Sequence, residues 1–272
     1  MKQNRGEIAD LIFKNLKSNQ KELKKQFNAH KNEIGYFYLD NLLPKELALE
    51  IHKNFPSTAD AVQRKSLREY KFTAFQMNKY NILLEETIFA FQDERIVSLV
   101  SEICGIEKVF PDSNLYAGGL SLMQKDNFLN PHLDNSHDKD RNRWRVLNLL
   151  YYVTPNWELE NGGNLELWPK GLNEKQITIT SKFNRLVVMA THQKSWHSVN
   201  KVLANDMRCC VSNYYFSEKP FLASDNFHIT TFRARPEEKA KDFILQIDNK
   251  LRSAVRKLFK KGVRENPHQY KK

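Results

Sequence analysis

Residues 115–232 carry a dense series of short segments rich in β-branched and aromatic residues, and this series limits the folds that the chain can adopt. Turn residues such as Asn161-Gly162-Gly163-Asn164 separate the segments, and no helical periodicity lies between them. Strands are expected at 119–124, 131–134, 145–153, 164–168, 176–180, 185–190, 195–202, 208–216 and 226–232. Many short strands without intervening helices favour a sandwich or barrel over a parallel α/β sheet. The sequence therefore predicts a mainly β fold with flanking helices.

The segments on either side of this region have helical periodicity. Apolar residues at three- and four-residue steps predict N-terminal helices at 8–16, 44–54, 85–91 and 94–103. After Pro236 a further apolar stripe predicts a helix whose stripe packs against the barrel or a neighbouring helix. The stripe consists of Phe243, Ile244, Ile247, Leu251, Val255, Leu258 and Phe259.

The net charge of +11 is confined to the two ends of the chain. Residues 1–31 hold 8 Lys/Arg and 3 Asp/Glu, residues 237–272 hold 11 and 5, and residues 32–236 hold 24 of each. Such charges favour solvated helix faces, with attraction of an acidic or phosphorylated partner as the alternative. A nucleic-acid partner is not expected, because the basic residues form no stripe with aromatic partners.

Hydropathy and cysteine usage point to a cytoplasmic protein. The mean hydropathy is −0.64, and no apolar run approaches the roughly 20 residues of a membrane span. Residues 1–26 lack the apolar segment of a secretory signal. Cys104 stands alone and Cys209 and Cys210 are adjacent, which favours reduced thiols.

The triplet His132-Leu133-Asp134 is the most informative short motif. Residues i and i+2 of a strand share a face, so this imidazole and carboxylate can bind one metal ion together. His197, on a distant strand, is the best candidate for a third ligand. Two histidines and one carboxylate on one face of an ion leave positions open, an arrangement that suits non-haem Fe(II) working with O₂.

Arg208 follows His197 by eleven residues. If the chain turns between them, the two residues lie on adjacent antiparallel strands, and Arg208 can point into the same barrel mouth. A buried guanidinium needs an anion and matches a carboxylate in a bidentate way. A metal-chelating keto acid with a far carboxylate, such as 2-oxoglutarate, fits this geometry.

These residues belong to a longer pattern. In order, the matching stretches are Phe128 to Asp134, Arg145 to Tyr152, Pro155 to Trp157, Gly162 to Leu167, Asn184 to Val188, His197 and Arg208. Over residues 113–216 the chain resembles the prolyl-4-hydroxylase-like branch of the Fe(II)/2-oxoglutarate-dependent dioxygenases. Gly35-Tyr36-Phe37 and residues 40–44 are similar to the lead-in segment of these enzymes.

The resemblance implies a double-stranded β-helix (jelly roll, cupin-like) core. It implies iron held by His132, Asp134 and His197, with Arg208 gripping the far carboxylate of 2-oxoglutarate and Asn148 facing the same cosubstrate. Ascorbate is included among the expected cofactors as an auxiliary reductant. We expect one structural unit, with a helical N-terminal support region (1–112), a catalytic core (113–235) and a C-terminal helix and tail (236–272).

Two positions depart from the family pattern. Many relatives carry Tyr on the strand before the metal motif, where this chain has Met123, so that contact to 2-oxoglutarate is lost or comes from elsewhere, with Tyr116 as the candidate. Relatives also often have Ser or Thr where this chain has Cys210.

The predicted activity is hydroxylation of an unactivated C–H bond, with release of succinate and CO₂. Asp134 fills the site that related halogenases leave for chloride, and the second Arg of nucleic-acid demethylases is absent after Arg208. The expected substrate is a small metabolite or a peptidyl side chain. Polar and aromatic residues expected near the mouth are Asn135, His137, Arg141, Arg143, Trp157 and Trp168, although barrel packing is favoured for the two tryptophans.

Two alternatives stay open. A cupin-like metal-dependent hydrolase or isomerase would share the barrel and the triad but would not depend on 2-oxoglutarate. A non-catalytic basic binding module would use the barrel as a scaffold, but a scaffold has no need of Arg208 beside a metal triad. The sequence does not define the oligomeric state.

Overall fold

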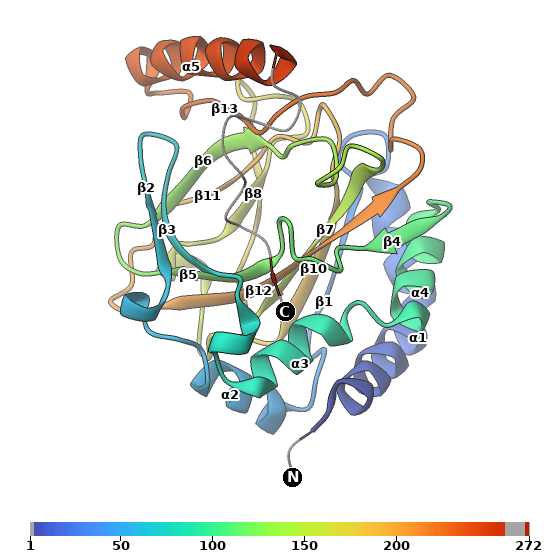
Figure 1. Ribbon diagram of the computed structural model, residues 1–272. Coiled ribbons are helices and arrows are strands. Elements are labelled where there is room, and N and C mark those ends of the chain that lie inside the picture. Colours follow the sequence, from blue (N-terminus) through green and yellow to red (C-terminus); the bar gives the residue numbers. More distant parts are fainter. Residues whose placement is uncertain (1–2, 259–269, 272) are drawn as a thin grey trace.

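A computed structural model describes residues 3–258 and 270–271 of the chain (Figure 1). The described helices are α1 (Arg5–Ala29), α2 (Lys45–Lys53), α3 (Ile82–Ala90), α4 (Glu94–Cys104) and α5 (Lys239–Leu258). The described strands are β1 (Tyr36–Leu39), β2 (Val62–Lys65), β3 (Glu69–Ala74), β4 (Val109–Pro111), β5 (Gly119–Met123), β6 (Phe128–Leu133), β7 (Trp144–Tyr152), β8 (Leu165–Leu167), β9 (Ile177–Ile179), β10 (Arg185–Ala190), β11 (His197–Val199), β12 (Arg208–Ser217) and β13 (Thr231–Phe232).

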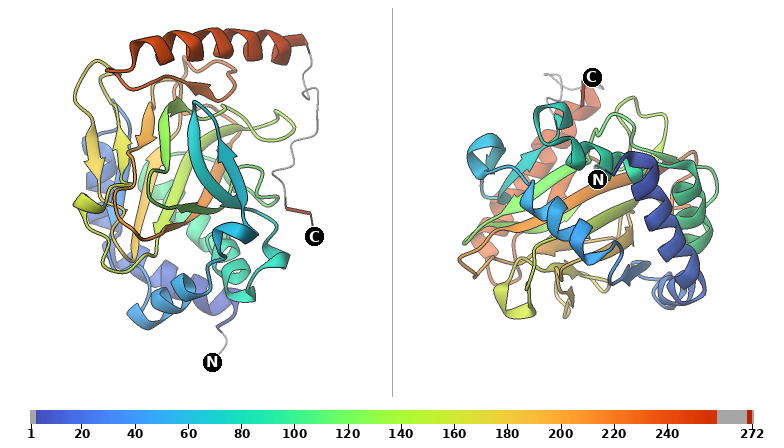
Figure 2. Two further views of the ribbon diagram at one scale, coloured as in Figure 1. Left: turned by 90° about the vertical axis from the view of Figure 1, so that its left-hand side faces the viewer. Right: turned by 90° about the horizontal axis from the view of Figure 1, so that it is seen from below.

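The strands form one curled antiparallel sheet in the order β1-β10-β7-β12-β5-β3-β6-β11-β8-β9. β13 joins β6, β2 joins β3 and β4 joins β12 outside this path. The sheet folds back on itself, and α5 lies across one end of it (Figures 1 and 2). Residues of the strands and of α5 line a cavity at this end. The predicted class, a mainly β jelly roll with flanking helices, is confirmed.

The helices α1 to α4 cover one side of the sheet (Figure 1). Asn4 caps the start of α1 in a capping box with Glu7, and Gly105 ends α4 in a left-handed conformation. α1 is longer than the predicted helix at 8–16 and continues to Ala29. Ile8, Ile12 and Leu16 of α1 are fully buried, as the periodicity predicts. None of the helices in the described part of the chain is both long and apolar enough to cross a membrane.

Four strands of the N-terminal part were not expected. Residues 1–112 contain β1, β2, β3 and β4 in addition to helices. β3 pairs with both β5 and β6, so it lies inside the barrel wall rather than beside it. Its sequence alternates, with Glu69, Lys71 and Thr73 lining the interior cavity.

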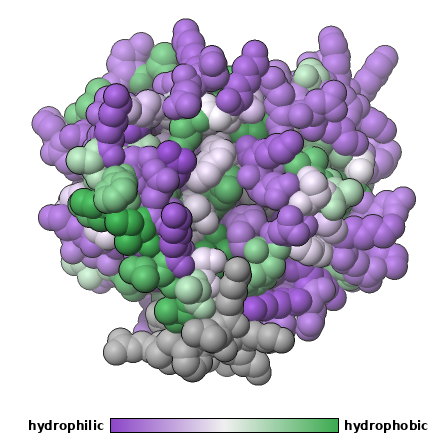
Figure 3. Space-filling view, turned by 90° about the horizontal axis from the view of Figure 1, so that it is seen from above, coloured by the Kyte–Doolittle hydropathy of each residue, from purple (hydrophilic) through white to green (hydrophobic). Residues whose placement is uncertain are grey.

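The apolar stripe of the C-terminal helix is exposed, so the prediction that it packs against the barrel was wrong. Exposed fractions are 66% for Phe243, 52% for Ile244, 46% for Ile247, 64% for Leu251 and 43% for Val255. The side chain of Leu258 and the whole of Phe259 lie outside the described residues. Figure 3 shows a hydrophobic band across an otherwise largely hydrophilic face on this side of the molecule.

Polar contacts hold α5 instead. Asp242 forms an ion pair with Arg233 at 2.7 Å, and Asp248 forms one with Arg68. The side-chain oxygen of Asn249 accepts a hydrogen bond from the backbone N–H of Phe232 at 3.0 Å. Leu245 is the deeply buried apolar residue of the described part of the helix. α5 lies across one end of the barrel (Figure 2). Its contacts with the rest of the molecule are therefore largely polar, through Asp242, Asp248 and Asn249.

Candidate metal and cosubstrate site

The three side chains of the predicted metal motif converge at the open end of the barrel. His132 on β6 and His197 on β11 are direct cross-strand partners, and Asp134 follows β6 immediately. The Nε2 atoms of the two histidines each lie 3.7 Å from a carboxylate oxygen of Asp134. One ligand atom from each residue lies within 4.8 Å of the others, a spacing that one metal ion can bridge.

Backbone carbonyls orient both imidazoles. His132 Nδ1 lies 3.0 Å from the Asn130 carbonyl, and His197 Nδ1 lies 2.9 Å from the Ser195 carbonyl. A carbonyl accepts only, so each Nδ1 carries the proton and each Nε2 keeps its lone pair. Burial, followed by repulsion from His197, lowers the pKa of His132 to about 3. The ring is therefore neutral at physiological pH, as a metal ligand must be.

Asp134 supplies the negative charge of the site. Burial raises the pKa of Asp134, but Arg145 and the two imidazoles outweigh that effect and hold it below its usual value. Its Oδ2 atom is buried and has no hydrogen-bond partner. A buried carboxylate oxygen without a donor is costly unless a cation completes it. The donor set of two imidazole nitrogens and one carboxylate therefore fits a metal ion.

Arg208 begins β12 and is 3% exposed. Its Nη2 contacts Ser121 Oγ at 3.4 Å and Met123 Sδ at 2.9 Å, and its guanidinium carbon lies 5.3 Å from the centre of the Tyr152 ring. No carboxylate of the described residues forms an ion pair with it, and its Nε is buried without a partner. A buried cation in this state needs an anionic ligand.

The other predicted cosubstrate residues also line the cavity. Asn148 on β7 is buried, and its Oδ1 has no hydrogen-bond partner. Met123 lies opposite Arg208 in the β5–β12 register, at the position that the sequence assigned to it. Tyr116 lines the cavity and interacts electrostatically with Arg141.

The cavity measures about 1130 Å³ and contains the triad, Arg208 and Asn148. Asn135 and His137 line it as expected, whereas Arg141 and Arg143 do not. Trp157 and Trp168 are buried and donate to Gly162 O and Ser198 Oγ, which confirms barrel packing for both.

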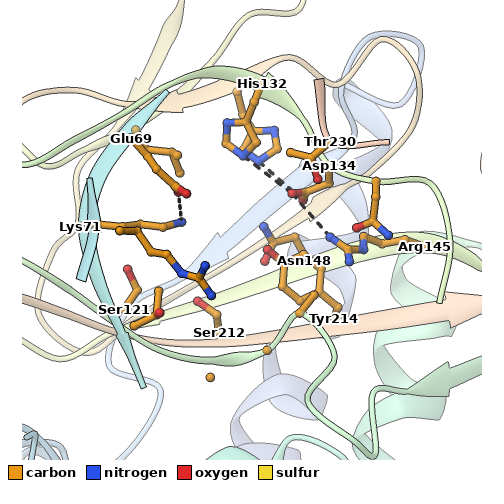
Figure 4. Close-up of a pocket in the computed structure, with 18 of the residues that line it drawn as sticks. Glu69, Lys71, Ser121, His132, Asp134, Arg145, Asn148, Ser212, Tyr214 and Thr230 are labelled. Atoms are coloured by element: carbon orange, nitrogen blue, oxygen red, sulfur yellow. Dashed lines mark ion pairs between the residues drawn. The ribbon is translucent and has the colours of Figure 1, made fainter. Parts of the chain in front are cut away.

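Sequence reasoning missed several charged residues of the cavity, among them Glu69, Lys71 and Arg145. Glu69 and Lys71 on β3 form an ion pair at 3.1 Å, and Arg145 on β7 lies 3.5 Å from Asp134. Figure 4 shows Lys71 and Arg145 entering the cavity from opposite sides. The register of β7 with β12 shifts beside Arg145, and such a bulge redirects a side chain that regular alternation would send elsewhere.

Comparisons with known proteins agree with this geometry. Residues 118–216 match the family model of the 2OG-Fe(II) oxygenase superfamily. The matched segment belongs to this superfamily. The segment includes His132 and Asp134 of the predicted metal motif, together with His197 and Arg208. The predicted enzyme class, a 2-oxoglutarate-dependent dioxygenase, is confirmed, and membership implies iron and 2-oxoglutarate as cofactor and cosubstrate.

Solved structures share the oxygenase fold. A prolyl-4-hydroxylase from Pseudomonas putida superposes with a TM-score of 0.54 at 13% identity, covering 72% of this chain and 100% of its own. A prolyl hydroxylase from Trichoplax adhaerens superposes with a TM-score of 0.53 at 20% identity, covering 78% of this chain and 96% of its own. It was solved in complex with a peptide fragment of the hypoxia inducible factor oxygen degradation domain. HygX from Streptomyces hygroscopicus, solved with nickel and 2-oxoglutarate bound, superposes with a TM-score of 0.51 at 10% identity, covering 71% of this chain and 86% of its own. No curated protein matches by sequence.

Proposed function

We propose that this oxygenase hydroxylates an unactivated C–H bond of a small metabolite or a peptidyl side chain and releases succinate and CO₂. The observation that carries the proposal is Arg208, a buried guanidinium without a carboxylate partner in the same cavity as a metal triad. A solved relative of the same fold holds a peptide fragment, and HygX has been solved with hygromycin B bound, so the fold accommodates both substrate sizes.

In this proposal His132, Asp134 and His197 hold ferrous iron through Nε2, a carboxylate oxygen and Nε2. Bound iron with 2-oxoglutarate supplies the oxidising chemistry, in which O₂ is consumed and the keto acid is decarboxylated. The chain itself fixes the orientation of both imidazoles through the carbonyls of Asn130 and Ser195, and burial keeps the ring of His132 neutral. It also places the ligands within a largely buried cavity, which limits access of water to the reacting atoms.

Arg208 and Asn148 orient the cosubstrate. Arg208 offers a two-pronged donor set to the far carboxylate of 2-oxoglutarate, while the amide of Asn148, which lines the same cavity, offers a neutral polar contact to the cosubstrate. Tyr116 as a further contact to the cosubstrate, and ascorbate as an auxiliary reductant, stay predictions.

A cytoplasmic location is also proposed, supported by three free, buried cysteines.

The test adds Fe(II) and 2-oxoglutarate to the protein under anaerobic conditions and measures the visible metal-to-ligand charge-transfer band. Succinate formation is then measured after air is admitted. We expect the band in the unmodified protein and its loss in His132→Ala and Asp134→Ala. His52→Ala, on α2 away from the cavity, is the control and should keep the band. Retention of band and turnover in both triad variants would remove the assignment. Metal-dependent turnover without 2-oxoglutarate would favour the hydrolase or isomerase alternative.

A further inference from the structure

The cavity carries an excess of positive charge that iron and 2-oxoglutarate leave in place. Among the described residues, eight Lys/Arg line it (Arg64, Arg68, Lys71, Lys139, Arg145, Arg208, Arg252 and Arg256), against Glu69, Asp134 and Asp140. The two positive charges of a ferrous ion offset the two negative charges of 2-oxoglutarate. Six of these eight cations, and all three acids, come from residues 32–236, which are neutral as a set, so their local excess is a property of this cavity, and Arg252 and Arg256 of the basic C-terminal helix add to it.

Some of these cations already have partners. Lys71 pairs with Glu69 at 3.1 Å, and Arg68 and Arg252 share the carboxylate of Asp248. Arg208 is assigned to the cosubstrate. Arg145 has only Asp134 at 3.5 Å, which is itself a proposed metal ligand, and Arg256 forms no ion pair with any described residue.

Arg145, His137 and Arg256 line the cavity near its mouth, and Arg141, which does not line it, joins them in one cluster. Arg141 Nη2 reaches the backbone carbonyl of Arg256 at 3.4 Å, and its guanidinium lies 4.2 Å from the centre of the Phe227 ring. The ring of His137 lies 4.6 Å from the same Phe227 ring. Burial first, and then Arg145, Arg141 and Arg256, lower the pKa of His137 to about 3, which is consistent with three guanidinium groups close to one imidazole.

This cluster has unused donors. The Nε atoms of Arg141 and Arg145 and the Nε2 of His137 are all buried without a hydrogen-bond partner, and Arg145 is 5% exposed. Arg141 also holds a left-handed backbone (φ 61°), which a non-glycine residue adopts at a cost. Like charges held together with unsatisfied donors are unfavourable unless an anion joins them.

The anion at this cluster is not the carboxylate held by Arg208. Arg208 and Phe216 lie eight residues apart on β12, and Phe216 is the register partner of Arg145. At about 3.4 Å per residue, the two positions are roughly 27 Å apart along the strand. Arg145 and Arg208 therefore enter the cavity from different ends of β12, and one carboxylate does not satisfy both.

We propose that the substrate carries an anionic group, a phosphate or a carboxylate, which is bound at the cavity mouth by Arg141, Arg145 and Arg256. This inference rests on the proposed oxygenase function for the identity of the ligand as substrate. It assigns part of the recognition to α5, because Arg256 lies on that helix. It also accounts for the largely polar contacts of α5 with the rest of the molecule.

The experiment uses the full chain loaded anaerobically with Fe(II) and saturating 2-oxoglutarate, so that Arg208 is occupied. Inorganic phosphate and acetate are titrated separately by calorimetry. The double variant R141Q/R256Q is compared with R143Q/K250Q, which removes the same charge from the same loop and the same helix but at residues that neither line the cavity nor contact this cluster. We expect binding of at least one anion to weaken by about tenfold or more in R141Q/R256Q, since charge-assisted hydrogen bonds are lost, and to stay within about twofold in the control.

The two arms identify the chemistry of the group. Tighter binding of phosphate indicates a phosphorylated substrate, and tighter binding of acetate indicates a carboxylated one. Absence of binding of both anions, or equal weakening in the two double variants, would overturn the proposal. The same anion titration can be made on the metal-free protein, so it does not depend on iron. If the anions bind but the charge-transfer band is missing, the result counts against the proposed oxygenase function and not against the anion site.

Discussion

His132 and His197 face each other directly across antiparallel strands β6 and β11, with ring centres 4.1 Å apart. The pair is 65 residues apart in sequence but is fixed by the register of a single strand pair. A one-residue slip would turn one imidazole to the opposite face of the sheet. The geometry of the metal site is therefore set by backbone hydrogen bonds before any metal is bound.

Arg145 should stabilise the metal-free protein more than the metal-loaded one. Arg145→Met leaves Asp134 buried without its cationic neighbour, which costs about 3 kcal/mol when a buried pair is broken. A bound divalent ion restores a positive partner, so the loss should shrink. Denaturant unfolding with and without Zn²⁺ measures both values, and Arg143→Met is the control for the loop. An equal loss in both states would show that Arg145 acts only through packing.

Arg208 should control the requirement for 2-oxoglutarate. Arg208→Ala removes a charge-assisted pair, so we expect KM for 2-oxoglutarate to rise by about tenfold or more, whereas Arg208→Lys should give an intermediate value. Steady-state succinate formation at varied 2-oxoglutarate provides the measurement. An unchanged KM in Arg208→Ala would remove this role.

Stability should fall as the solution becomes acidic. Burial lowers the pKa of His192 to about 4 and, with the nearby guanidinium groups, that of His137 to about 3. Between the ordinary value of 6.5 and these values, the unfolded chain binds protons that the native chain does not. Each of the two imidazoles then lowers the free energy of unfolding by up to about 1.4 kcal/mol for every pH unit by which the pH falls. Denaturation midpoints from pH 7 to pH 5 should decline, and His192→Asn should reduce the slope; a flat profile would contradict the prediction.

Two glycines with positive φ should respond differently to alanine. A Cβ at Gly162 (φ 69°) would lie 2.1 Å from the carbonyl oxygen of Lys201, whereas a Cβ at Gly171 (φ 85°) meets nothing within 4 Å. Gly171→Ala should cost about 1–2 kcal/mol for the left-handed backbone alone. Gly162→Ala adds a clash with backbone and should cost about 3 kcal/mol or more. Similar free energies of unfolding for the two variants would show that the turn at Gly162 relaxes freely.

The β core could be predicted because its residues obey one local rule. β10 was predicted at residues 185–190, as observed, and the metal motif depends only on strand alternation and on one distant histidine. β3 could not be recognised as easily, since Glu69 and Lys71 on its inner face resemble a solvated segment. They face inward because they line a polar cavity, which local sequence does not reveal.

The role of Arg145 in the cavity and the orientation of α5 were missed for a different reason. The side chain of Arg145 reaches the triad through an irregular register, which the simple period of a strand does not predict. The pattern of α5 correctly predicts a helix but not its orientation. Ion pairs of Asp242 and Asp248 with arginines of other segments decide which side faces the barrel, and such partners are visible only in three dimensions.

The position of β3 limits how this enzyme can be divided. β3 comes from outside the segment that matches the family model, yet it separates β5 from β6 in the barrel wall. A fragment made of residues 113–235 alone would leave both of those strands with an unpaired edge beside the proposed metal site. We therefore expect that fragment to aggregate rather than to work as a minimal oxygenase, so any trimming for engineering has to retain the β2–β3 hairpin.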